Sequence, residues 1–257
     1  MKNYQSYVIC TSPRSGSTLL CKLLAATGLS GKPESYFHRS TLDHLWDDLG
    51  LAMRRPEDER TTLQQLFREA KSQGEAGTGI FGLRLQRHSF AFFMEKLSTL
   101  HPGLENDKAR FFAAFGKTLF IHLTRDDKLD QAISYVKAEQ TGLWHQAPDG
   151  RELERLSDPQ EPYYDPKQIT ERMQELIGLE TAWLKWFKEQ AIAPLVLRYD
   201  ELSASPQTTL ARVLKELGLN ENLSSRVVPG VAKLADEVSQ EWKQRYQLES
   251  TNEQGST

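Results

Sequence analysis

The sequence has few cysteines, no long apolar run and little net charge, and each absence excludes a class of protein. Its 257 residues include two cysteines, Cys10 and Cys21, too few for a disulfide framework. No apolar segment approaches the roughly 20 residues of a membrane-spanning helix, and residues 1–6 lack the apolar region of a signal peptide. The 32 basic and 35 acidic side chains give a net charge of −3, which is not the footprint of a nucleic-acid binder. The sequence therefore predicts a cytoplasmic protein with reduced cysteines, no nucleic-acid partner and no transmembrane segment.

Strand and helix patterns alternate along the chain, which is typical of an α/β domain. The expected strands cover residues 7–11, 80–85, 118–124 and 193–199. The expected helices cover residues 18–27, 90–100, 127–139 and 169–187, with a further helix that Ser205 and Pro206 open. The run 118–124 is apolar on both sides, so we expect it at the centre of the sheet. The helix 169–187 is expected to turn one apolar stripe inward, with Ile177 and Leu184 in it.

Two insertions and a tail depart from this alternation. Residues 39–79 are rich in charge, and residues 143–166 contain four prolines. Long insertions in an α/β domain often form lids or substrate walls, so both are expected to shape a binding site. We predict one domain over residues 1–248 and a disordered tail over residues 249–257, which contain no apolar side chain.

The turn Ser12-Pro-Arg-Ser-Gly-Ser-Thr18, between an expected strand and an expected helix, is the most informative segment. Such a turn directs several backbone N–H groups, and the positive end of the helix dipole, at one point where a phosphate or sulfate oxygen can bind. It resembles the P-loop of nucleoside triphosphatases but lacks the Gly-Lys pair, and Arg14 is its one cation. We therefore predict anion binding without a metal ion. The alternative is an ordinary turn in which Ser17 or Thr18 caps the helix.

A second polar group follows the expected central strand. Arg125 comes just after that strand, and Ser134 lies nine residues later on the next helix. Ligands of open parallel sheets bind beyond the carboxyl ends of the strands. A guanidinium and a hydroxyl group there could hold a second phosphate of the same ligand. The alternative is a solvated cluster in which Arg125 pairs with Asp126 and Asp127.

These segments together resemble the sulfotransferases that use 3′-phosphoadenosine 5′-phosphosulfate, and among them the bacterial trehalose 2-sulfotransferase type of carbohydrate sulfotransferases. Further similarity lies in residues 28–37, 183–187, 197–202 and 241–246. The resemblance implies a P-loop-like three-layer α/β/α domain with a central, mostly parallel sheet and helical insertions. It also implies that Arg125 and Ser134 bind the donor's 3′-phosphate. The residues implied to bind the 5′-phosphosulfate are Pro13, Arg14, Ser15, Gly16, Ser17 and Thr18.

The resemblance implies transfer of a sulfuryl group to a hydroxyl group of a carbohydrate or glycolipid, with adenosine 3′,5′-bisphosphate as the product and no metal ion. Arg14 would stabilise charge on the departing phosphate. A homodimer is an expected assembly. The alternatives are a P-loop kinase-like phosphotransferase and a non-catalytic nucleotide-binding protein of the same fold.

The catalytic base is the point where the chain departs from these relatives. The trehalose enzymes carry a Glu two places after the Pro of a Gly-x-Pro-x-Glu-aromatic-Phe segment, whereas here Glu34 directly follows Pro33. We predict Glu34 as the base, with His38 as the second choice, and an exposed loop carboxylate as the alternative role of Glu34. The residues expected to contact the acceptor are Pro33, Glu34, Tyr36 and Phe37.

Overall fold

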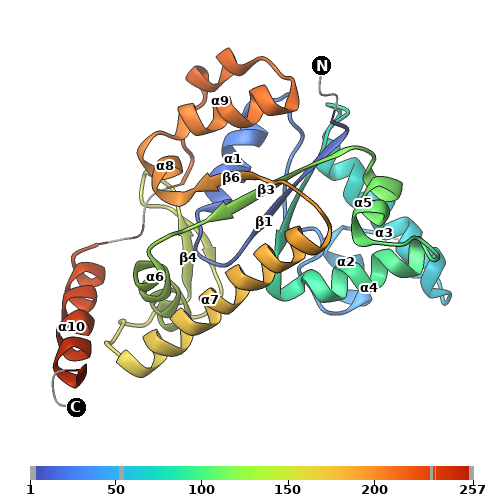
Figure 1. The fold of residues 1–257 in the computed structure, drawn as a ribbon. Coiled ribbons are helices and arrows are strands. Elements are labelled where there is room, and N and C mark those ends of the chain that lie inside the picture. The colour runs from blue at the N-terminus through green and yellow to red at the C-terminus, as the bar shows by residue number, and fades with distance from the viewer. Residues whose placement is uncertain (1–3, 52–54, 232–233, 235, 255–257) are drawn as a thin grey trace.

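A parallel four-stranded sheet lies at the centre of the protein (Figure 1). The computed structural model describes residues 4–51, 55–231, 234 and 236–254. The strands are β1 (Ser6–Thr11), β2 (Phe81–Gln86), β3 (Thr118–Thr124) and β6 (Leu195–Arg198), in the order β2-β1-β3-β6. All three pairings are parallel. The predicted strands are therefore confirmed, and β3 lies inside the sheet as expected.

Helices cover both faces of the sheet, because successive side chains of each strand point to opposite faces. On β1, Val8 and Cys10 join one apolar core, while Tyr7 and Ile9 join the other. The helices of the structure are α1 (Ser17–Ala26), α2 (Leu42–Asp48), α3 (Glu59–Glu75), α4 (Phe90–Leu100), α5 (Asp107–Phe115), α6 (Lys128–Thr141), α7 (Pro166–Glu189), α8 (Tyr199–Ala204), α9 (Pro206–Leu217) and α10 (Glu237–Gln254). The first core takes side chains from α2, α3, α4, α5 and α7, and the second from α1, α8 and α9. The predicted three-layer α/β/α fold is confirmed.

Some helix details differ from the sequence predictions. Ser205 stands at the N-cap position of α9 and Pro206 follows it, but the Ser205 side chain forms no capping hydrogen bond. On α7, Ile177 is 47% exposed and Leu184 is 54% exposed, so their assignment to the buried stripe was wrong. Helical periodicity gives the direction of the stripe, but the neighbouring elements decide its width.

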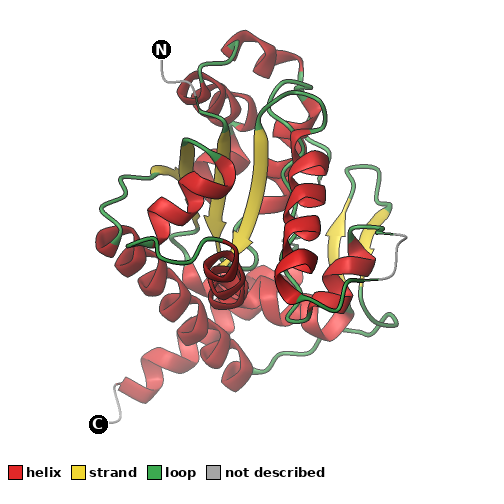
Figure 2. Ribbon diagram, turned by 90° about the vertical axis from the view of Figure 1, so that its right-hand side faces the viewer, coloured by secondary structure: helices red, strands yellow, loops and turns green. Residues whose placement is uncertain are grey.

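The two insertions have regular structure and different positions. Residues 39–79 contain α2 and α3, and α3 buries Leu63, Leu66 and Phe67 in the core. The apolar faces of α2 and α3 therefore pack into the core. Residues 143–166 contain the antiparallel hairpin β4 (Leu143–Gln146) and β5 (Glu152–Arg155), which stands apart from the central sheet in Figure 2.

The C-terminal segment is helical where the sequence predicted a disordered tail. Helix α10 continues to Gln254, and residues 255–257 lie outside the described residues. Polar contacts hold this end, because Glu249 accepts hydrogen bonds from Tyr164 Oη at 2.7 Å and from Arg245 Nε at 2.9 Å. An apolar pattern could not reveal such contacts. Within the described part of the chain, no helix is both long and apolar enough to cross a membrane.

Two glycines should respond oppositely to substitution by alanine. A Cβ at Gly82 would lie 2.5 Å from Tyr7 Oη and 3.0 Å from Pro33 Cβ, whereas a Cβ at Gly178 on α7 meets nothing within 4 Å. Gly82→Ala should lower the free energy of unfolding by about 1–3 kcal/mol through overpacking. Gly178→Ala should raise it by about 0.5–1 kcal/mol through better helix propensity. Urea denaturation measures both, and changes of the same sign would contradict the packing described for β2.

Candidate active site

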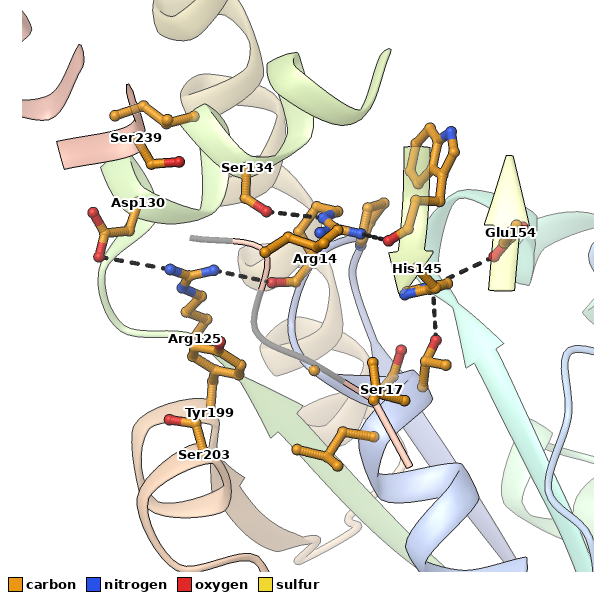
Figure 3. A pocket seen from close by; sticks show the side chains of 18 of the residues that line it. Arg14, Ser17, Arg125, Asp130, Ser134, His145, Glu154, Tyr199, Ser203 and Ser239 are labelled. Carbon is orange, nitrogen blue, oxygen red and sulfur yellow. Dashed lines mark hydrogen bonds and ion pairs between the residues drawn. The ribbon is translucent and has the colours of Figure 1, made fainter. Parts of the chain in front are cut away.

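A cavity of about 520 Å³ opens where the strands of the central sheet end (Figure 3). The loop after β1 forms one wall, and residues at the ends of β2 and β3 form others. Helices α6, α8 and α10 and the hairpin β4–β5 also line it. The cavity therefore lies at the sheet edge where ligands of open parallel sheets bind.

The loop between β1 and α1 leaves the N-terminus of α1 uncapped. Gly16 is the N-cap residue, with φ of 84°, and no side chain forms a capping hydrogen bond. The N–H groups of the first helical turn have no acceptor within the helix. That turn, Ser17 to Leu19, lines the cavity. The alternative in which Ser17 or Thr18 caps the helix is therefore wrong, and the turn is open to an anion.

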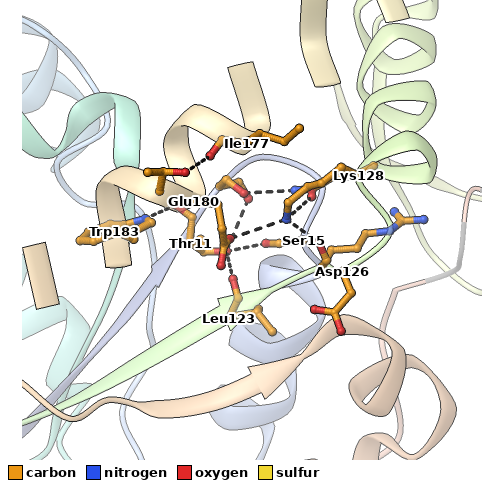
Figure 4. A network of polar contacts seen from close by, with 12 residues as sticks. Thr11, Ser15, Leu123, Asp126, Lys128, Ile177, Glu180 and Trp183 are labelled. Carbon is orange, nitrogen blue, oxygen red and sulfur yellow. Dashed lines mark hydrogen bonds and ion pairs between the residues drawn. The ribbon is translucent and has the colours of Figure 1, made fainter. Parts of the chain in front are cut away.

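Buried hydrogen bonds hold this loop from behind. Trp183 Nε1 donates to the Thr11 carbonyl oxygen at 2.8 Å, and Gln131 Nε2 donates to that of Pro13 at 2.6 Å. Ser15 Oγ lies 2.5 Å from Thr11 Oγ1, so the Ser15 side chain faces the interior (Figure 4). Any contact of Ser15 with a ligand would have to come from its backbone.

A half-buried ion pair supports the same loop through α6 and α7 (Figure 4). Lys128 Nζ lies 3.6 Å from Glu180 Oε2 and donates to Gln131 Oε1 at 3.2 Å, and also to the Arg125 carbonyl oxygen. Burial lowers the pKa of Lys128. Burial also opposes ionisation of Glu180, but His122 and Lys128 hold its pKa below the ordinary value. Lys128 thus connects the loop to the segment after β3.

Positive charge dominates the cavity. Of the described residues, Arg14, Arg84, Arg125 and Lys243 line it, against the carboxylates Asp130 and Glu154. The backbone of Arg14 is left-handed, with φ of 60°. Burial, followed by the charge of Arg125, lowers the pKa of Arg14 to about 10. The cavity is therefore suited to an anionic ligand.

Arg14 and Ser134 lie together, as do Arg125 and Tyr199. Arg14 Nε donates to Ser134 Oγ at 3.0 Å, and Arg14 Nη1 donates to the Trp144 carbonyl oxygen at 2.6 Å. The Arg125 guanidinium lies over the Tyr199 ring, 4.4 Å from its centroid. Ser134 therefore shares the cavity with Arg125, as predicted, but its hydroxyl group contacts Arg14.

Arg125 has an unused donor. Its Nη1 donates to the Arg14 carbonyl oxygen at 3.4 Å, and its Nη2 lies 3.6 Å from Asp130 Oδ2. Its buried Nε has no hydrogen-bond partner within the described part of the chain. Buried polar groups are normally satisfied, so an orphaned guanidinium nitrogen beside the cavity fits an anionic ligand.

The residues expected to act as base lie off the cavity. The exposed side chain of Glu34 does not line it, and the Glu34 carbonyl oxygen accepts from the Arg84 N–H at 3.0 Å. His38 Nδ1 lies 2.7 Å from the Ser35 carbonyl oxygen, and His38 Nε2 lies 3.6 Å from Asp48. The assignment of either residue as base stays a prediction.

The expected acceptor contacts are mainly packing contacts. Phe37 is 2% exposed, and the centroid of its ring lies 4.5 Å from the centroid of the Phe67 ring in the core. Its predicted contact with an acceptor was wrong, because the aromatic core encloses it. Pro33 is buried, and Tyr36 Oη donates to the Lys32 carbonyl oxygen at 2.7 Å. Neither Pro33 nor Tyr36 lines the cavity.

Among the residues that line the cavity and that the sequence patterns missed are Arg84, His145, Glu154 and Tyr199. Arg84 Nη1 donates to Thr18 Oγ1 at 2.8 Å, and His145 Nε2 lies 2.9 Å from the same oxygen. Arg84 could have been noticed as a charge inside an expected apolar strand. Tyr199 could have been noticed as the residue directly after another strand. His145 and Glu154 left no signal, because they meet only through the fold of the hairpin.

The chain is similar to known proteins along nearly its whole length. Residues 6–249 match the model of a family described as Stf0 sulphotransferase. The trehalose 2-sulfotransferase of Mycobacterium tuberculosis is 28% identical, and that of Mycolicibacterium smegmatis is 25% identical, each over 95% of both chains. The solved sulfotransferase domain of the Synechococcus PCC 7002 olefin synthase is 16% identical, with a TM-score of 0.43, and the match covers 87% of this chain and 77% of that one.

His145 should make stability depend on pH. Burial, followed by the charges of Arg14, Arg84 and Lys22, lowers the pKa of His145 to about 3. In the unfolded chain this pKa is about 6.5, so between these values the unfolded state binds the extra proton and stability falls as the pH falls. From pH 7.5 to 5.0 the parent should lose about 2 kcal/mol more unfolding free energy than His145→Gln.

Urea denaturation at the two pH values measures this difference. His44→Gln, on an exposed position of α2, is the matched control. The same pH-dependent loss in the parent and in His145→Gln would show that the imidazole is not buried among these cations.

Proposed function

The chain belongs to the Stf0 sulphotransferase family, and we propose that it transfers a sulfuryl group from 3′-phosphoadenosine 5′-phosphosulfate to a carbohydrate hydroxyl group. The chain is thus a sulfotransferase, as its motifs predicted. Family membership favours this reaction over phosphotransfer and over a non-catalytic role. Both named relatives are trehalose 2-sulfotransferases, which supports a carbohydrate acceptor, either free or as part of a glycolipid.

The observation that carries the donor proposal is the pair of anion sites in one cavity. The uncapped turn of α1 and Arg14 form the first site, and Arg125 with its unpartnered Nε forms the second. The donor nucleotide carries two separate phosphate positions and supplies the sulfuryl group. The two sites therefore fit a 3′,5′-substituted nucleotide better than one with a single phosphate position.

The residues of the loop would stabilise negative charge on the leaving group. The N–H groups of Ser17 to Leu19 are fixed before a ligand arrives, because the hydrogen bonds behind the loop hold its backbone. The Arg14 guanidinium is fixed by its own hydrogen bonds to Ser134 and to the Trp144 carbonyl oxygen. Preorganised donors of this kind stabilise negative charge that develops on a leaving oxygen. Arg125 would hold the second phosphate, with Tyr199 beneath its guanidinium group. Asp130 and Lys243, 3.0 Å apart, would fix the far wall.

Adenosine 3′,5′-bisphosphate should bind more tightly than AMP or ATP, without Mg²⁺. Thermal shift and calorimetry measure this preference, because a ligand at 100 times its Kd adds about 2.7 kcal/mol of stability. Arg125→Ala should weaken binding of the bisphosphate about 10- to 100-fold, which corresponds to one charged hydrogen-bonding partner. Binding of AMP should change much less.

The matched control is Arg212→Ala, which removes an exposed arginine of α9 that does not line the cavity. Equal affinity for the three nucleotides would contradict the two-site proposal. An equal loss of AMP binding in Arg125→Ala would contradict the role given to Arg125.

Arg14→Ala should slow donor turnover about 100-fold, because one preorganised donor near a developing charge contributes on the order of 3 kcal/mol to lowering the barrier. Binding of adenosine 3′,5′-bisphosphate should weaken as well, since the product keeps the 5′-phosphate. Steady-state release of the bisphosphate from the donor measures the rate. A rate within about threefold of the parent would make Arg14 a structural residue.

A further inference from the structure

Sulfuryl transfer to a hydroxyl group needs a proton acceptor, and the cavity offers few. Of the described residues, two carboxylates line it, Asp130 and Glu154. Asp130 forms ion pairs with two cations, because its carboxylate lies 3.6 Å from Arg125 Nη2 and 3.0 Å from Lys243 Nζ. Transfer of a proton to Asp130 would break both of these ion pairs. Glu154 is the other carboxylate.

The hairpin pairs Glu154 with a histidine. The antiparallel register places His145 of β4 opposite Glu154 of β5. Cross-strand neighbours of this kind have side chains on the same face of the hairpin. His145 Nε2 lies 3.4 Å from Glu154 Oε2, and the Glu154 side chain is 48% exposed. Figure 3 shows both side chains at the cavity, on the side of Arg14.

This pair lies at the end of the cavity that holds the uncapped helix turn. His145 Nε2 is 2.9 Å from Thr18 Oγ1, and Thr18 belongs to the first turn of α1. Glu154 is therefore separated from the first anion site by one imidazole ring and one hydroxyl group. Asp130 lies instead beside Arg125, at the second anion site.

Neither Glu34 nor Ser35 places a carboxylate at the end of the cavity where Thr18 lies. Glu34 forms a parallel bridge with Leu83, and in such an extended segment neighbouring side chains point to opposite sides. The side chain that faces the loop is that of Ser35, whose Oγ accepts from Arg84 Nε at 2.7 Å. Arg84 in turn contacts Thr18. The position next to Arg84 thus holds a hydroxyl group, and the Glu34 carboxylate is exposed outside the cavity.

We propose that Glu154 is the catalytic base for the acceptor hydroxyl group and that His145 is its positioning residue. This inference rests on the proposed function. The hydroxyl proton passes to a carboxylate oxygen of Glu154 while the hydroxyl oxygen forms its bond to sulfur. The bond from sulfur to the phosphate oxygen of the donor breaks, and that oxygen keeps the electron pair. The Nε2–H group of His145, shared between Thr18 Oγ1 and Glu154 Oε2, holds this carboxylate at the cavity.

The protonation state of His145 agrees with its role as a positioning residue. Burial and the surrounding cations lower its pKa to about 3, so the imidazole is neutral at neutral pH. A neutral imidazole can donate one N–H without adding a positive charge beside the base.

The test compares Glu154→Gln with Glu152→Gln. Glu152 lies on the same strand, is 45% exposed, pairs with Arg155 and does not line the cavity, so it is the matched control. The probes are trehalose and water, each as acceptor for the labelled donor. Glu154→Gln should lower the rate about 10²- to 10⁴-fold, as loss of a general base does, and should leave the affinity for adenosine 3′,5′-bisphosphate unchanged. Glu152→Gln should keep the parent rate.

Glu34→Gln and His145→Gln complete the set. His145→Gln should lower kcat while the bisphosphate still binds, and Glu34→Gln should keep the parent rate. A Glu154→Gln rate within threefold of the parent, with either probe that the parent turns over, overturns the inference while the proposed function stands. A rate loss confined to Glu34→Gln does the same. A parent that neither binds the bisphosphate nor consumes the donor overturns the proposed function, and this inference with it.

Discussion

The uncapped first turn of α1 is the feature on which the site depends. A helix N-terminus without a capping side chain needs an acceptor, and here Gly16 opens that turn toward a cavity. Gly16 serves because its φ is 84° and because a Cβ there would lie 2.6 Å from the Tyr199 ring. The Tyr199 ring also lies against Arg125. Gly16 therefore lets the first turn of α1 lie against Tyr199, which in turn contacts Arg125.

The rest of the structure fixes this turn from outside the cavity. Trp183 on α7 and Gln131 on α6 each donate to a loop carbonyl oxygen, and Lys128 joins the loop to the end of β3. Rigid support matters because donors that are already oriented need no reorganisation when charge develops. The hairpin adds the remaining wall and brings His145 against Thr18. The loop, the sheet ends and the hairpin thus act as one charged cavity.

Much of this arrangement could be predicted from the sequence, because local patterns decide it. Alternation of apolar runs predicted all four strands of the parallel sheet, and small residues around Arg14 indicated the loop that lines the cavity. Long-range contacts decided the rest. Phe37 is enclosed by Phe67 and Phe93, and the pairing of His145 with Glu154 depends on the register of a hairpin within a proline-rich insertion. Side-chain direction at residues 34 and 35 likewise required the pairing with β2.

We propose that the cavity carries out sulfuryl transfer from a 3′,5′-substituted nucleotide. The most direct measurement incubates the protein, in the presence of EDTA, with ³⁵S-labelled 3′-phosphoadenosine 5′-phosphosulfate and a panel of neutral sugars that includes trehalose. A parallel incubation contains γ-³²P-labelled ATP and Mg²⁺. We expect ³⁵S in a sugar that becomes anionic, and no ³²P in any sugar. Transfer of ³²P, or binding of the sulfate donor without any release of its sulfur, would contradict it.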